Sequence, residues 1–140
     1  MRFWDTSGLV AVCANDGHVA RAAPLLESDP DVMVWWGTRL ECVSAVRKLR
    51  RDGELNEVSM GQALERLDQL RAHWSEVAPS AVVRVTAERL LHRHVLFAAD
   101  ALQLAAALEW AGEGGGAALV SFDQRLARAA AAESFVILPG

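Results

Sequence analysis

Short apolar runs alternate along this chain with longer segments in which apolar residues recur every three or four positions. The runs FW, VMVWW, AALVSF and FVIL are bounded by polar or turn-forming residues, as expected of short strands that are buried on both faces. Strands that alternate with helices indicate an α/β fold, with a mostly parallel sheet between two layers of helices. No linker or internal repeat divides the sequence. We therefore expect residues 1–140 to form a single three-layer α/β/α domain.

The expected helices are recognised by their amphipathic spacing and by the residues at their ends. Thr6 and Ser59 are capping residues that precede two of them, and Gly53 and Gly112 follow two others. The segment GEGGG lacks the lysine and hydroxyl residue of a phosphate-binding loop, so we interpret it as a link. The expected helices cover residues 6–14, 18–26, 38–51, 59–74, 80–94, 99–111 and 124–133.

Acidic residues stand where the expected strands give way to helices. Asp5 follows FW, Glu41 follows VMVWW and Asp123 follows AALVSF. Parallel strands deliver their carboxyl ends to one edge of a sheet, where the next helices begin, so these side chains are expected to converge on one cleft. Asp100 also stands at the start of an expected helix, although a helix and not a strand precedes it.

Four carboxylates in one cleft would repel each other. A charged pair at about 4 Å costs on the order of 4 kcal/mol at an effective dielectric constant near 20. A divalent cation is the usual remedy, and carboxylate oxygens suit Mg²⁺ or Mn²⁺. Such ions activate a bound water and stabilise charge on a phosphodiester. The pattern therefore favours a metal-dependent phosphodiesterase.

Each acid also has a purely structural interpretation. Asp5 and Asp123 are suited to cap the helices that follow them. Thr38 and Glu41 have the spacing of a capping box, in which the glutamate bonds back to the start of its helix. Asp100 is placed in a first turn, where the helix dipole favours a negative charge. It is the joint pattern of the four acids, and not any one of them, that favours a metal site.

Charge and hydropathy limit the partners and the location of the chain. The formal net charge is −4 and the isoelectric point is near 5.5, which argues against coating duplex nucleic acid but not against local cleavage. No stretch approaches the roughly 20 apolar residues of a membrane span, and no signal peptide opens the sequence. Cys13 and Cys42 lie in helical patterns without metal-ligand spacing, as expected of buried free thiols. We expect a cytoplasmic protein without membrane attachment.

Three arginines are candidate contacts to a phosphate backbone. Arg47 and Arg50 lie on the helix that carries Glu41, and Arg125 lies two residues beyond Asp123. Arginines that face the cleft would hold phosphate groups. The alternative for the pair on the Glu41 helix is a solvated helix end whose positive charge suits the dipole. Both interpretations stay open at this stage.

The chain offers few other candidates for chemistry or for base stacking. Trp36 is the tryptophan expected to be partly exposed, where an unpaired base would stack. The histidines lie in helical, largely polar settings, and none is expected to act as a catalytic base: His18, His73, His92 and His94.

Four segments resemble the acidic motifs of PIN-domain ribonucleases, and most closely those of the VapC-like toxins of bacterial toxin–antitoxin modules. They are FWDTS, TRLECVSAVRK, FAADALQLAAAL and LVSFDQRLARAA, and they follow the order of the family along nearly the whole chain. The resemblance implies that Mg²⁺ or Mn²⁺ is bound by Asp5, Glu41, Asp100 and Asp123. It implies supporting hydroxyl groups at Ser7 and Ser121. Gln103 departs from the family, because many relatives carry histidine there, and Ser121 stands where threonine is frequent.

The resemblance also implies a biological setting. It indicates an endoribonuclease that acts as a toxin, a homodimer, and a cognate VapB-like antitoxin held in an apolar groove between Thr38 and Val77. The alternative is a PIN-like module that binds a protein and has lost catalysis. Two other enzyme classes fit poorly. A haloacid-dehalogenase phosphatase needs an aspartate where Ser7 stands, and a receiver domain needs a late lysine, whereas the single lysine is Lys48.

Overall fold

The computed structural model describes residues 1–140 and contains a five-stranded sheet in which every strand is parallel to its neighbours. The strand order β3-β2-β1-β4-β5 places the first strand at the centre. Phe3 in β1 lies opposite Met33 in β2 and Leu119 in β4, which fixes the register of the three central strands. The strands are β1 (Arg2–Trp4), β2 (Val32–Trp35), β3 (Ser75–Val77), β4 (Ala118–Val120) and β5 (Val136–Leu138).

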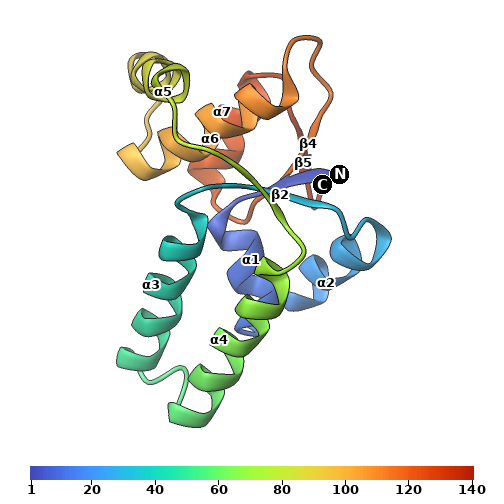
Figure 1. The fold of residues 1–140 in the computed structure, drawn as a ribbon, viewed down its shortest axis with the longest axis vertical. Coiled ribbons are helices and arrows are strands. Elements are labelled where there is room, and N and C mark those ends of the chain that lie inside the picture. Colours follow the sequence, from blue (N-terminus) through green and yellow to red (C-terminus); the bar gives the residue numbers. More distant parts are fainter.

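Helices cover both faces of the sheet (Figure 1). One layer contains α1 (Thr6–Cys13), α2 (Val19–Ser28), α3 (Thr38–Arg51) and α4 (Glu57–Arg71). The other contains α5 (Ala81–Arg93), α6 (Ala98–Ala111) and α7 (Gln124–Ala132). This arrangement confirms the predicted three-layer α/β/α fold. None of the helices is both long and apolar enough to cross a membrane.

Two neighbouring residues of β1 anchor the two halves of the core. Side chains alternate between the faces of a strand, so Phe3 packs with α5, α6 and α7 while Trp4 packs with α1 and the layer around it. Both side chains are fully buried. A central parallel strand is covered on both faces, which explains why the apolar residues Phe3 and Trp4 follow each other directly.

Three sequence-based expectations about the element boundaries were wrong. The sheet has a fifth strand, β3, which the sequence did not reveal because Ser75 and Glu76 are polar, exposed residues of an edge strand. Helix α4 begins at Glu57 and not at Ser59, because Asn56 is the cap and Ser59 is its capping-box partner. Trp74 lies beyond the end of α4 rather than within it, since the helix ends at Arg71.

Close packing of α1 on the sheet makes Gly8→Ala a test of this fold. A Cβ atom at Gly8 would stand 3.0 Å from Cε3 of Trp4 and 3.3 Å from the carbonyl oxygen of Val120. We expect the substitution to lower the free energy of unfolding by about 1–2 kcal/mol, because crowding outweighs the gain in helix propensity. Gly61→Ala in α4 is the matched control, since nothing lies within 4 Å of its Cβ position. It should raise that free energy by about 0.5–1 kcal/mol. Urea denaturation of both variants measures the difference, and a shift of the same sign in both would contradict the packing.

Candidate active site

A cleft of about 470 Å³ opens where the carboxyl ends of the central strands meet the following helices. All four of the predicted acids border it: Asp5, Glu41, Asp100 and Asp123. Asp5 directly follows β1, and Asp123 comes three residues after the end of β4. The topology therefore gathers into one space four carboxylates that are far apart in the sequence.

Asp5 is the most deeply buried of these acids, and both of its carboxylate oxygens accept hydrogen bonds. Its Oδ1 accepts from the Ser7 hydroxyl at 2.7 Å and from the Gly8 amide at 2.9 Å, so it caps α1 as well as bordering the cleft. Its Oδ2 accepts from the Ser121 hydroxyl at 2.5 Å. Burial is the main cause that raises the pKa of Asp5 from 3.8 to about 6, with a smaller contribution from the negative charge of Asp123.

Glu41 is held from the other side of the cleft by Gln103 on α6. The capping-box interpretation is wrong, because Gly37 precedes the helix without a side-chain hydrogen bond and Glu41 accepts instead from Nε2 of Gln103 at 3.0 Å. The same Nε2 lies 3.1 Å from Oγ1 of Thr6 and 2.9 Å from Oγ1 of Thr38. The Oε1 atom of Gln103 is buried without a partner. Burial raises the pKa of Glu41, and the charges of nearby acids raise it further.

Asp123 and Asp100 come from the starts of α7 and α6. Asp123 accepts a hydrogen bond from the Leu126 amide at 3.0 Å and so caps α7, as its structural interpretation predicted. Asp100 lies in the first turn of α6, and no strand precedes this helix. Burial raises the pKa of Asp100, and the charge of Asp123 adds to the effect. The capping role of Asp123 and its place in the cleft are therefore compatible.

The donor chemistry of the cleft suits a hard divalent cation. Three of the four carboxyl groups have a raised pKa, because burial and the like charges of their neighbours disfavour ionisation. As the side chains stand, no three His, Cys, Asp or Glu residues are close enough to hold one ion. A cation would therefore be bound by one or two carboxylates, with water or a phosphate completing its shell. Mg²⁺ commonly binds in this way.

The cleft contains residues that the sequence analysis did not assign to it. Asp16 and His18 border it from the loop between α1 and α2, and Phe122 borders it after β4. The rings of His18 and Phe122 stack at 4.4 Å, and Oδ1 of Asp16 accepts from the His18 amide at 2.8 Å. The sequence around Asp16 was interpreted only as a break between helices, and Phe122 only as part of a strand. No spacing rule connects the two segments.

The three predicted phosphate contacts occupy different surroundings. Arg47 and Arg50 do not border the cleft, and the Nε atom of Arg50 lies 3.6 Å from Oε1 of Glu57. These positions fit the solvated helix end better than a phosphate contact. Arg125 does not border the cleft either, but its positive charge lowers the pKa of Asp100 and so opposes the effect of burial. Of the three, only Arg125 is therefore seen to act on one of the cleft acids.

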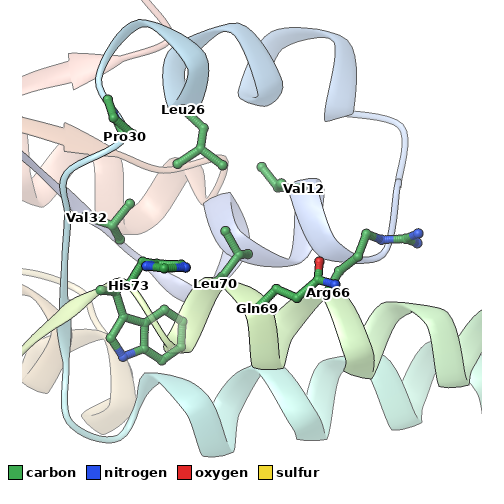
Figure 2. Close-up of a pocket in the computed structure, with 9 residues that line it drawn as sticks. Val12, Leu26, Pro30, Val32, Arg66, Gln69, Leu70 and His73 are labelled. Carbon is green, nitrogen blue, oxygen red and sulfur yellow. The ribbon is translucent and has the colours of Figure 1, made fainter.

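A second cavity of about 390 Å³ lies away from the acids and is mainly apolar (Figure 2). Val12 of α1, Leu26 of α2 and Leu70 of α4 converge on it from three helices (Figure 2). Arg66 lies at the same cavity, and its Nε donates to the carbonyl oxygen of Cys13 at 2.7 Å. This apolar groove on the α1–α4 layer shares no lining residue with the carboxylate cleft.

Comparisons with known proteins identify the fold and the family of the chain. In structure, the chain is similar to the Mycobacterium tuberculosis protein VapC20, described as a Sarcin-Ricin loop cleaving toxin, with a TM-score of 0.69 and 22% identity over 97% of both chains. It is also similar to PAE2754 from Pyrobaculum aerophilum, with a TM-score of 0.67 and 18% identity over 97% of this chain and 87% of the other. No curated protein sequence gives a significant match. The family model described as PIN domain matches residues 2–132, and the chain therefore belongs to the PIN domain family.

Proposed function

We propose that the protein is a metal-dependent endoribonuclease that hydrolyses RNA phosphodiester bonds. The observation that carries the proposal is the single cleft bordered by Asp5, Glu41, Asp100 and Asp123, where burial and mutual repulsion raise the pKa of three of the carboxyl groups. Membership of the PIN domain family and the structural similarity to VapC20, described as a Sarcin-Ricin loop cleaving toxin, support the same chemistry.

The side chains of the cleft would hold Mg²⁺ or Mn²⁺ and orient a phosphate against it. When bound, the cation supplies a water of lowered pKa and compensates the charge of the phosphate in the transition state. Ser7 and Ser121 fix the rotamer of Asp5, and Gln103 fixes that of Glu41. Asp100 and Asp123 accept no hydrogen bond from another side chain, so neither carboxylate is held in this way. Pre-oriented carboxylates lower the cost of reorganisation during the reaction.

The proposal is tested by incubating the purified protein with RNA in the presence and absence of divalent metal. We expect cleavage with Mg²⁺ or Mn²⁺ and none with excess chelator, because the carboxylates alone supply no electrophile for the phosphate. Restored cleavage after the metal is added back distinguishes loss of the cation from denaturation. Cleavage that persists in excess chelator would reject the metal mechanism.

The second candidate function is a PIN-like module that binds a partner and has lost catalysis. The observation that favours it is that no three acids stand close enough to share one ion. Calorimetric titration with Mg²⁺ separates the two candidates, because the nuclease requires the cleft carboxylates to bind the ion and the binding module does not. A protein that is folded, binds no divalent metal and cuts no RNA would be the binding module.

The biological part of the proposal is a toxin with a cognate VapB-like antitoxin. The apolar cavity at Val12, Leu26 and Leu70 offers a groove for an amphipathic antitoxin helix, and it lies partly on α4, within the segment expected for this role. Homodimer formation belongs to the same proposal, since Val82 and Val85 leave an apolar strip exposed on α5. So does a reducing, cytoplasmic location, which suits the two buried free thiols.

A further inference from the structure

A basic pocket of about 380 Å³, distinct from the cleft and from the apolar cavity, lies between α7 and the segment that joins α5 to α6. Its lining includes His94, Arg125 and Arg128, and none of the four cleft acids contributes to it. The net charge of the chain is −4, whereas the charged side chains that line this pocket are the two arginines and no acid. Such a concentration of positive charge indicates an anionic ligand.

The two arginines of this pocket are free to bind an anion. Arg125 and Arg128 are three residues apart on α7 and so lie on the same face of the helix. Neither guanidinium group forms an ion pair, and the Nε of Arg128 donates only to the carbonyl oxygen of Gln124, at 3.3 Å. The nearby acid is already engaged: Glu133 contacts Nη1 of Arg93 at 3.1 Å and Nε2 of His94 at 3.0 Å.

Arg125 also belongs to an exposed aromatic platform. Its guanidinium carbon lies 4.5 Å from the centroid of the Phe97 ring, and the Phe97 side chain is 68% exposed. Phe97 caps α6 three residues before Asp100, and Arg125 follows Asp123 by two residues. The platform is thereby joined through short segments to two of the cleft acids. An exposed aromatic ring with an arginine over it is a typical stacking surface for an unpaired base.

We propose that this pocket and platform form an RNA subsite beside the carboxylate cleft. Arg125 and Arg128 bind backbone phosphates, and a nucleobase stacks on Phe97 in place of solvent. The inference rests on the proposed nuclease function, because the cleft determines where the strand is cut. It adds a requirement for substrate: the nucleotide at the platform is unpaired, since a base within a duplex cannot reach an aromatic side chain without leaving its stack.

Arg128→Gln tests the phosphate contact. Arg71→Gln is the control, because Arg71 is an exposed arginine at the end of α4 that forms no ion pair. Binding of a short fluorescein-labelled oligouridylate is measured by anisotropy, with Ca²⁺ compensating the acids and a gel verifying that the probe is intact. We expect Kd to rise about tenfold for Arg128→Gln and not for Arg71→Gln. The slope of log Kd against log salt concentration should fall by about 0.7 for the lost phosphate contact.

Phe97→Leu tests the stacking platform. Because the Phe97 side chain is exposed, the variant is expected to fold as the wild type does. We expect Kd for the single-stranded probe to rise about tenfold and Kd for a duplex of equal length to stay unchanged. Equal losses for both probes would overturn the platform. Unchanged RNA binding together with an altered hydrodynamic mass would also overturn it and would make Phe97 a contact between copies of the chain.

The outcome for the wild type separates this inference from the proposed function. If the wild type cuts RNA with Mg²⁺ but Arg128→Gln and Phe97→Leu bind and cut as it does, the nuclease stands and the subsite is rejected. If the wild type binds the probe through these residues but cuts no RNA, the subsite stands and the nuclease is rejected.

Discussion

Asp100→Asn is expected to reduce the rate of metal-dependent RNA cleavage by at least about a hundredfold, without loss of stability. The rate should fall because an amide supplies no negative charge to hold the cation, and loss of one electrostatic group in an active site typically has an effect of this size. Stability should be kept or increased, since the raised pKa of Asp100 shows that its charge is disfavoured in the folded protein. Single-turnover cleavage and thermal denaturation measure the two effects.

Asp31→Asn is the matched control for this substitution. Asp31 is exposed and forms no ion pair, so the same change of charge there should leave both cleavage and the melting temperature unchanged. The pair also tests the proposed toxin role in bacteria. Expression of the wild type and of Asp31→Asn should arrest growth, whereas Asp100→Asn should not. Cleavage by Asp100→Asn at the wild-type rate would remove this residue from the metal site.

Without divalent metal, the protein is expected to lose stability as pH rises from about 4 to about 7. Asp5 has a pKa of 3.8 in an ordinary setting and about 6 in the fold, so the folded state holds its proton more tightly. The stabilisation is fully present below 3.8 and is lost as pH rises through about 6. The ionised carboxylate then costs on the order of 3 kcal/mol, and Glu41 and Asp100 act in the same direction.

Thermal denaturation with chelator across this range measures the effect, which amounts to a shift in Tm on the order of 10 °C. Asp5→Asn isolates the contribution of Asp5, because the amide has no proton to release and the difference from the wild type should grow with pH. Mg²⁺ should restore the lost stability near neutral pH and have little effect near pH 4, where the acids are protonated. A difference between wild type and variant that does not depend on pH would reject the raised pKa of Asp5.

Much of the fold follows from sequence because its strongest signals are local. Phe3, Trp4 and Asp5 occupy three successive positions, so an apolar strand and the acid at its end are visible in a single short segment. The parallel arrangement then brings Asp123 to the same edge, since both residues follow central strands. Strand β3 was not predicted from the sequence, because it has few apolar residues of its own. It is stabilised by its pairing with β2.

The parts of the site that the sequence did not reveal depend on contacts between distant segments. The hydrogen bond between Gln103 and Glu41 joins residues 62 positions apart, and no periodicity connects them. His18 and Phe122 are likewise brought together only by the packing of their loops. The spacing of Thr38 and Glu41 suggested a local cap, but burial beside Gln103 provides the glutamate with a stronger partner.

The amide nitrogen of Gln103 has three oxygen atoms within hydrogen-bonding distance but carries only two hydrogen atoms. At any moment, therefore, one of the three oxygen atoms accepts no hydrogen bond from the amide. When Glu41 does not accept, the two hydrogen atoms can be donated to the hydroxyl oxygens of Thr6 and Thr38. If the carboxylate turns toward a cation and its bond to Gln103 breaks, both N–H groups of the amide still have a threonine oxygen to donate to, so no buried donor is left without a partner.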